Sequence, residues 1–170
     1  MSREEIEFRL ACAGDAPRLA AMSRDLVEEG LGWSWVPSRV AWHVRAPESV
    51  VLVAQRRTRI AGFAIMRFVV EHAHLDLLAV EPTYRRAGIG RGLIAWLEES
   101  ALVAGISVIY LEVRASNACA RSFYQKLGYR PIQRVPRYYD GRETAIRMAR
   151  DLWHSVMTDT TGEPPESARG

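Results

Sequence analysis

The sequence predicts an α+β fold, in which a central mixed and mostly antiparallel sheet of about seven strands is flanked by about four helices. The length of 170 residues and the hydrophobic content of 48% are typical of one compact domain with a sizeable core. Seven segments have the apolar patterns of strands, and four have the apolar periodicity of helices. One succession of strand, helix and strand indicates a parallel pair, because a crossover through a helix returns the chain in the same direction.

The chain opens with a strand and a helix. Residues 5–10 alternate well enough for a strand, and residues 14–27 have helical periodicity with Pro17 in the first turn, where a missing N–H is tolerated. Glycines and a proline interrupt the next segment. We therefore expect only a short helix there, at residues 38–43.

The middle of the chain predicts an antiparallel meander. Residues 50–55 and 60–70 are apolar, the first rich in β-branched side chains, and the polar turn at residues 56–59 joins them. Residues 72–80 form a third strand-like run, which Pro82 ends. Consecutive strands with short connections usually pair as antiparallel neighbours.

The next helix is expected from near Leu93 to Gly105. Its apolar stripe consists of Leu93, Leu97, Ala101 and Ala104. Residues 107–113 then form a short strand parallel to the strand before the helix, which places the connecting turn at the carboxyl end of that earlier strand. Open α/β sheets bind their ligands at such ends.

The last third predicts a helix and a strand pair. The helix covers residues 117–127, and the strands cover residues 129–135 and 144–151. We expect residues 1–153 to form the domain. Residues 154–170 are expected to be a disordered tail, because their Thr, Gly, Pro, Glu and Ser side chains offer little to bury.

The composition excludes several classes of protein. No apolar run approaches 18 residues and no secretory leader is visible, so we expect a cytoplasmic protein without a membrane span. Cys12 and Cys119 are too few for a disulfide framework or a four-cysteine zinc site, and we expect them to be small buried residues. The net charge of +3 does not require nucleic-acid binding.

A basic, glycine-rich turn stands between the strand that ends at Val80 and the helix that follows. It reads Arg85-Arg86-Ala87-Gly88-Ile89-Gly90-Arg91-Gly92. Glycines let backbone N–H groups converge, the helix N-terminus carries partial positive charge, and arginines donate hydrogen bonds, so the turn favours a phosphate ligand. The nucleotide-triphosphate and dinucleotide patterns do not fit its spacing. The turn by itself is equally compatible with an ordinary loop of solvated arginines.

The segments around this turn carry a family resemblance. The stretch LDLLAVEPTYRRAGIGRGLIAWLEESALVAG, followed by LEVRASNACARSFYQKLGY, resembles the Gcn5-related N-acetyltransferase (GNAT) family. Arg85, Gly88 and Gly90 match the acetyl-CoA signature of that family, in the strand-to-helix context that it requires. Within the family, these motifs and Tyr138-Tyr139 look most like the ribosomal-protein alanine N-acetyltransferases.

The resemblance implies a GNAT fold and transfer of acetyl from acetyl-CoA, as co-substrate, to a primary amine such as a protein N-terminal α-amine. It implies Tyr124 as proton donor to the departing thiolate and Glu112 as base, with no metal. Contacts to acetyl-CoA are implied for Leu78, Ala79, Val80, Arg85, Arg86, Ala87, Gly88, Ile89, Gly90, Arg91 and Asn117. Homodimer formation is an option that the family leaves open.

The two candidates on the helix at residues 117–127 have structural alternatives. Asn117 and Tyr124 are just under two turns apart and share a face, whereas Phe123 and Leu127 point elsewhere. Tyr124 could instead be a core aromatic residue with a satisfied hydroxyl group, and Asn117 could serve only as a helix cap.

Glu112 needs a partner, because it lies in an otherwise apolar strand. The partner is either the substrate amine or Arg114, two positions on along the same face. Asp76 is the reserve candidate for the base if no bulge intervenes on its strand. His72 and His74 share a face with metal-ligand spacing, but no third ligand is evident, so we expect ordinary strand histidines.

We expect direct transfer, in which a neutral amine attacks the thioester and a main-chain N–H near residues 78–80 stabilises the oxyanion. An α-amine, with a pKa of about 8, loses its proton more easily than a lysine. Residues 30–45 differ from the acceptor segment of the alanine acetyltransferases, so acetylation of a small amine or amino acid remains an alternative. A non-catalytic acyl-CoA-binding domain is a second alternative. The tryptophans Trp33, Trp35 and Trp42 either line an acceptor groove or simply pack.

Overall fold

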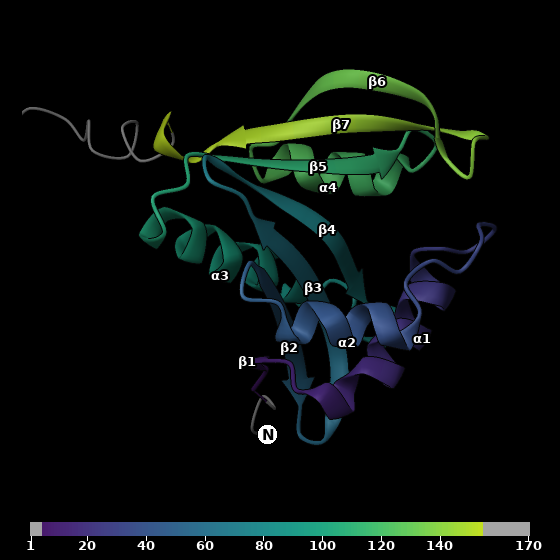
Figure 1. Ribbon diagram of the computed structural model, residues 1–170, viewed down its shortest axis with the longest axis vertical. Coiled ribbons are helices and arrows are strands. Elements are labelled where there is room, and N and C mark those ends of the chain that lie inside the picture. The colour runs from purple at the N-terminus through teal and green to yellow at the C-terminus, as the bar shows by residue number, and fades with distance from the viewer. Residues whose placement is uncertain (1–4, 155–170) are drawn as a thin grey trace, which may run out of the picture.

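The computed structural model describes residues 5–154, which form one seven-stranded sheet with helices on both faces (Figure 1). The strands are β1 (Glu7–Leu10), β2 (Ser49–Arg56), β3 (Arg59–Phe68), β4 (His72–Val80), β5 (Val108–Arg114), β6 (Arg130–Tyr139) and β7 (Glu143–Asp151). The α-helices are α1 (Ala16–Leu26), α2 (Pro37–Arg45), α3 (Ile89–Val103) and α4 (Ala118–Lys126). Short 3-10 helices, η1 (Ala13–Asp15) and η2 (Pro82–Tyr84), precede α1 and follow β4.

The strand order is β1-β2-β3-β4-β5-β7-β6, and every neighbouring pair is antiparallel except β4 and β5. This confirms the predicted α+β class, the β2–β3–β4 meander and the parallel pair. The parallel pair is joined through α3, as the sequence indicated.

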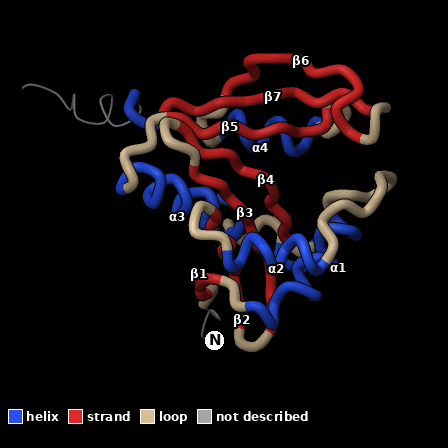
Figure 2. Tube along the Cα trace, in the orientation of Figure 1, coloured by secondary structure: helices blue, strands red, loops and turns tan. Residues whose placement is uncertain are grey.

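The two faces of the sheet are covered unequally. Helices α1 and α2 pack together over β2, β3 and the second half of β4, in a core that contains no residue of β5, β6 or β7. Figure 2 shows these two helices next to each other across one half of the sheet. On the opposite face, α3 and α4 share a larger core that extends from β2 to β7. The α1–α2 face of β5 and β7 therefore carries charged side chains such as Glu112 and Arg147 in place of a helix-covered core.

Helix α3 begins at Ile89, one turn earlier than the predicted start at Leu93. Gly90 and Gly92, which the sequence predicts to be part of the basic turn, lie within the helix. A Cβ atom on Gly90 would lie 3.2 Å from the Phe123 ring, and one on Gly92 would lie 2.5 Å from the Phe8 ring. These two glycines permit close packing. Of the three glycines in the turn, only Gly88, the N-cap, has a left-handed φ, of 79°.

The prediction for the two cysteines was wrong. Both Cys12 and Cys119 are exposed. Cys12 is the N-cap of η1 and Cys119 lies in the first turn of α4, so local position at a helix start overrides the usual burial of a small thiol.

Two further expectations concern the ends of the chain and the membrane. The tail predicted at residues 154–170 lies, apart from His154, outside the described residues. Among residues 5–154, no helix is long and apolar enough to cross a membrane.

Candidate active site

The parallel pairing of β4 and β5 ends at Leu75 and Leu111, although both strands continue. Figure 1 shows the two strands diverging from their shared end. A bulge contributes to this divergence: Ile65 of β3 pairs with Leu77 and its neighbour Met66 with Leu75, so Asp76 has no partner in the register. Before the bulge Leu75 faces the α3–α4 core, and after it Leu77 faces the α1–α2 core.

A cavity of about 320 Å³ occupies the gap between the diverging strands. Its lining comes from both faces of the sheet, with Glu28 and Trp35 from the α1–α2 segment and Asn117 and Tyr124 from α4. Asp76, Leu78 and Glu112 line it from the strands. The cavity thus connects the α1–α2 side to the α4 side through the sheet.

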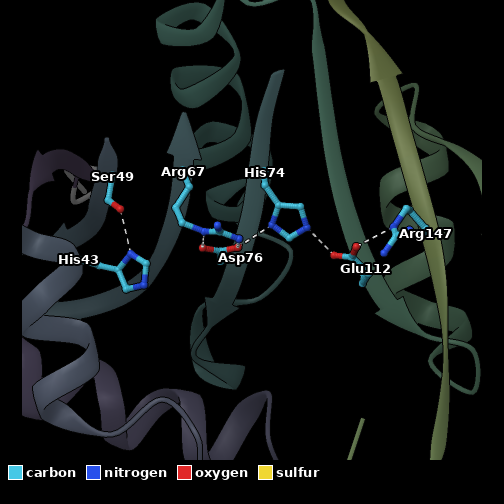
Figure 3. A network of polar contacts seen from close by, with 7 residues as sticks. All are labelled: His43, Ser49, Arg67, His74, Asp76, Glu112 and Arg147. Atoms are coloured by element: carbon cyan, nitrogen blue, oxygen red, sulfur yellow. Dashed lines mark hydrogen bonds and ion pairs between the residues drawn. The ribbon is translucent and has the colours of Figure 1, made fainter. Parts of the chain in front are cut away.

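A row of charged side chains crosses the uncovered face of the sheet next to this cavity (Figure 3). Arg67 of β3 donates two hydrogen bonds to Asp76, from Nε (2.5 Å) and from its terminal nitrogen (2.8 Å). His74 lies between two carboxylates, with Nδ1 2.5 Å from Asp76 and Nε2 2.5 Å from Glu112. Arg147 of β7 donates from Nε to Glu112 (2.8 Å). Four strands are therefore linked through one alternating row of charge.

This arrangement shifts the pKa values of its members. Burial would lower the pKa of His74, but hydrogen bonds to Asp76 and Glu112, with their negative charges, outweigh it and raise the pKa to about 9. Burial likewise opposes ionisation of both carboxylates, yet the bonds from His74 and the arginines lower the pKa of Asp76 and of Glu112. At neutral pH His74 is an imidazolium between two carboxylates.

Of the two alternatives for the partner of Glu112, the pairing with Arg114 is not found. Arg114 instead donates to the carbonyl oxygen of Val27 (2.8 Å) and lies 3.6 Å from a carboxylate oxygen of Glu143. The partners of Glu112 come from the neighbouring strands β4 and β7, and a single-strand spacing argument cannot reveal them.

The two histidines of β4 differ, and sequence reasoning missed the importance of one. The His72 ring lies edge-on against Tyr110, with centroids 5.3 Å apart. Both ring nitrogens of His74 are taken by carboxylates, which leaves no lone pair for a metal. No group of metal-ligating side chains was found among the described residues. The sequence did contain a signal for these contacts of His74. Asp76 is two residues further along the same strand, and Glu112 lies on the adjacent parallel strand.

Tyr124 is both a core residue and a cavity residue. It is 9% exposed and belongs to the α3–α4 core together with its neighbour Phe123, so the predicted separation of these two residues onto different faces was too strict. No partner for its hydroxyl group is found within residues 5–154. Burial raises the pKa of Tyr124 well above its ordinary value, so the phenol stays neutral.

Asn117 lies where both of its predicted roles, as a helix cap and as a ligand contact, are possible. Its Oδ1 accepts a hydrogen bond from the N–H of Ala120 (3.0 Å) and caps α4, and the residue also lines the cavity. The cap and a ligand contact are thus compatible.

The predicted acetyl-CoA residues form a path along the end of β4. Beyond Leu75 this strand pairs only with β3 among the described strands, so one main-chain edge of Leu78, Ala79 and Val80 faces the gap. The basic turn follows through η2, with Arg85, Arg86, Ala87, Gly88 and Arg91 exposed, Ile89 buried and Gly90 half-buried. None of Arg85 to Arg91 lines the cavity itself.

Of Trp33, Trp35 and Trp42, which were expected either to line an acceptor groove or simply to pack, one lines the cavity and two do not. Trp35 is buried and lines the cavity. Trp33 and Trp42 are 39% and 51% exposed and are not part of the lining.

The matching family model decides the affiliation of the chain. The model described as the acetyltransferase (GNAT) family matches residues 19–129. The chain belongs to this family. The GNAT match spans the α1–α2 segment, the diverging strands, the basic turn and α4. It therefore includes every wall of the cavity except the end of β6 and the β6–β7 turn.

Similar proteins include an alanine N-acetyltransferase and an N-alpha-acetyltransferase. The [ribosomal protein bS18]-alanine N-acetyltransferase of Escherichia coli K12 is 43% identical over 94 residues, which are 54% of this chain and 64% of that protein. An N-alpha-acetyltransferase of Sulfurisphaera tokodaii is 31% identical over 123 residues, 65% of this chain and 74% of that protein.

Solved GNAT structures share the fold over most of the chain. The ribosomal-protein-S18-alanine N-acetyltransferase from Escherichia coli superimposes with a TM-score of 0.76 at 29% identity, covering 87% of this chain and 94% of that one. The PaiA N-acetyltransferase of Thermoplasma acidophilum, in complex with coenzyme A, gives a TM-score of 0.75 at 21% identity, covering 86% of this chain and 99% of that one.

Proposed function

We propose that this chain is an N-acetyltransferase that moves the acetyl group of acetyl-CoA directly to a primary amine, with a protein N-terminal α-amine as the first candidate acceptor. The observation that carries the proposal is the cavity through the sheet, which has the His74–Glu112 pair next to one side and Tyr124 on the other. A donor and an acceptor can meet there from opposite faces.

On the donor side, the free main-chain edge of Leu78, Ala79 and Val80 is suited to hold the pantetheine arm by hydrogen bonds. The exposed arginines of the basic turn and the N-terminus of α3 are suited to the pyrophosphate. Asn117 lies on the same side of the cavity. The coenzyme A complex of PaiA supports this assignment by analogy of fold.

On the acceptor side, we assign proton removal to the His74–Glu112 pair. Asp76 holds Nδ1 of His74, which orients the ring and leaves Nε2 shared with Glu112. The amine nitrogen attacks the thioester carbon and its proton passes to this pair, directly or through water. A main-chain N–H of residues 78–80 stabilises the oxyanion until the C–S bond breaks.

Tyr124 then returns a proton to the thiolate. Its buried phenol is neutral over the whole working pH range, which keeps the proton available. A thiol has a pKa of about 8.5 in water, but the burial that raises the pKa of the Tyr124 phenol also raises that of a thiolate leaving into the same cavity, so the proton can still pass from the phenol to the departing sulfur.

A small amine is the second candidate acceptor, and one contact favours it. The main-chain N–H of Gly32, in the α1–α2 segment, bonds Oδ2 of Asp140 in the β6–β7 turn (2.6 Å). Both residues line the cavity, so this bond bridges its acceptor side and narrows the entrance. A peptide needs more room there than a free amine.

A panel of acceptors tests the proposal. Purified protein is given acetyl-CoA and one of three acceptor classes: peptides with free N-terminal alanine, the same peptides N-terminally blocked but containing lysine, and free small amines. Release of CoA thiol and the mass of the product are measured. We expect acetylation of the free N-terminal peptides, with Tyr124→Phe as the impaired control. Product from small amines alone supports the second candidate, and acetyl-CoA binding without product on any amine contradicts enzymatic function.

A further inference from the structure

The ring of Tyr124 is held by packing within the α3–α4 core and not by a polar contact among the described residues. No hydrogen-bond partner for its hydroxyl group exists within residues 5–154, so no polar contact fixes the ring. Its ring is instead held between Phe123, with centroids 5.1 Å apart at 69°, and Tyr129, with centroids 5.8 Å apart at 70°. Such edge-to-face contacts orient a ring only as well as the neighbouring rings are themselves fixed.

Tyr129 is fixed by a partly buried polar cluster at the edge of the α3–α4 core. Its hydroxyl group donates to Oε1 of Glu98 on α3 (3.1 Å). Arg150 of β7 donates to both oxygens of the same carboxylate (2.9 and 2.7 Å). Tyr129 is 1% exposed, and burial raises the pKa of Glu98 even beside the arginine. Apolar side chains of similar volume in place of Glu98 and Arg150 often give the same stability or more. A role other than stabilising the core therefore has to account for this ion pair.

The other neighbour of Tyr124 is tied to the same helix. Phe123 packs against Gly90, where a Cβ atom would lie 3.2 Å from the ring. The ring of Tyr124 is therefore placed between one residue that contacts the first turn of α3 and another that is bonded to its third turn. The first turn of α3 directly follows the basic turn that we assign to the pyrophosphate, so the packing of Tyr124 is linked to the donor side.

We propose that Glu98 is a positioning residue, which through Tyr129 holds the Tyr124 hydroxyl group at the reacting sulfur and couples its place to the helix that binds the donor. This rests on the proposed function, in which Tyr124 is the proton donor. Glu98 itself touches no substrate. A misplacement of a reacting group by about 1 Å can lower a rate by roughly 100-fold, so a looser ring has a measurable consequence.

The test compares Glu98→Gln and Tyr129→Phe with a matched core variant. Leu52→Val lies in the same core but on β2, three strands away from β5 in the sheet, and removes one methylene group. For Glu98→Gln we expect a fall in kcat of about tenfold with an unchanged KM for acetyl-CoA. Leu52→Val should lose thermal stability but keep its kcat. Equal kcat in all variants, with only the melting temperature lowered, would overturn the proposal.

A second measurement makes the outcome independent of catalysis. The aromatic NMR signals of Tyr124 in the free protein report the orientation and flipping rate of its ring. We expect them to move in Glu98→Gln and to stay in place in Leu52→Val. If the wild-type protein transfers no acetyl group, the proposed function fails, and the NMR comparison alone decides whether Glu98 holds the ring. Unmoved Tyr124 signals in Glu98→Gln contradict the inference even when the enzyme is active.

Discussion

At the scale of single residues, the hydroxyl group of Tyr124 is the most direct test of the chemistry. Tyr124→Phe keeps the ring between Phe123 and Tyr129 and removes only the proton donor. We expect turnover to fall by at least about tenfold, a threshold below the roughly 100- to 10,000-fold that general acid catalysis typically contributes, with little change in melting temperature. Steady-state kinetics with an N-terminal peptide measures this. Unchanged turnover removes Tyr124 as the acid.

The pH dependence of the rate tests the assignment of the base. Below a pH of about 9 His74 is protonated, and the His74–Glu112 pair accepts a proton only after His74 has lost its own. An α-amine with a pKa of about 8 also becomes neutral as the pH rises. We therefore expect kcat/KM to increase from pH 6 towards about pH 9 and then to level off. In His74→Gln the rise should follow the amine alone and end near pH 8; an identical profile in both proteins argues against His74.

At the scale of elements, the close approach of β3 to β4 at Gly62 is tied to the donor site. A Cβ atom on Gly62 would lie 2.9 Å from the main-chain oxygen of Ala79, and backbone cannot move aside as a side chain can. We expect Gly62→Ala to destabilise the fold by about 1–3 kcal/mol and to weaken acetyl-CoA binding, because it displaces the segment assigned to the pantetheine arm. Denaturant unfolding and calorimetric titration measure the two effects.

The matched control for Gly62→Ala is Leu52→Val, which destabilises the same core without touching β4. Acetyl-CoA affinity should be preserved in Leu52→Val. Equal affinity in both variants would show that the main-chain edge of residues 78–80 does not hold the donor.

The elements also show how far the sequence could be interpreted. Hydrophobic periodicity found every strand and every α-helix of the described residues to within about four residues, because it depends only on which side chains face a core. It did not find the two 3-10 helices. It could not give the register between strands, and the partners of Glu112 follow from that register. Glycines in α3 were assigned to a turn, because the need for space against Phe8 and Phe123 appears only once distant segments are packed. The residues assigned to acetyl-CoA and to catalysis stay predictions.

At the scale of the whole molecule, the charged row ties the two halves of the sheet together across the gap. Arg67 and Asp76 lie on β3 and β4, Glu112 and Arg147 on β5 and β7, and His74 is the link between them. The link depends on charge. His74 still pairs with Tyr110, one residue before the parallel pairing ends at Leu75, so the imidazolium adds a side-chain link to Glu112 where the strands begin to diverge.

This link predicts how stability changes with pH. The pKa of His74 is raised in the folded protein, so its contribution is complete below the unfolded value of about 6.5 and is lost as the pH rises to about 9. The lowered pKa values of Asp76 and Glu112 act in the opposite direction, and their contribution is lost in acid. We expect the melting temperature to fall between pH 6.5 and 9 in the wild-type protein.

His74→Gln should remove most of that alkaline slope while lowering the melting temperature at pH 6.5, since a neutral amide cannot bridge two carboxylates as an imidazolium does. Melting curves across pH 5–10 for both proteins measure the difference. A slope that persists in the variant would assign the alkaline loss to another group. If the slope does disappear, the proton on His74 that joins β4 to β5 is the same proton that must leave before the His74–Glu112 pair can act as the proposed base. Deprotonation of His74 would then raise the reaction rate and weaken the link between the two halves of the sheet.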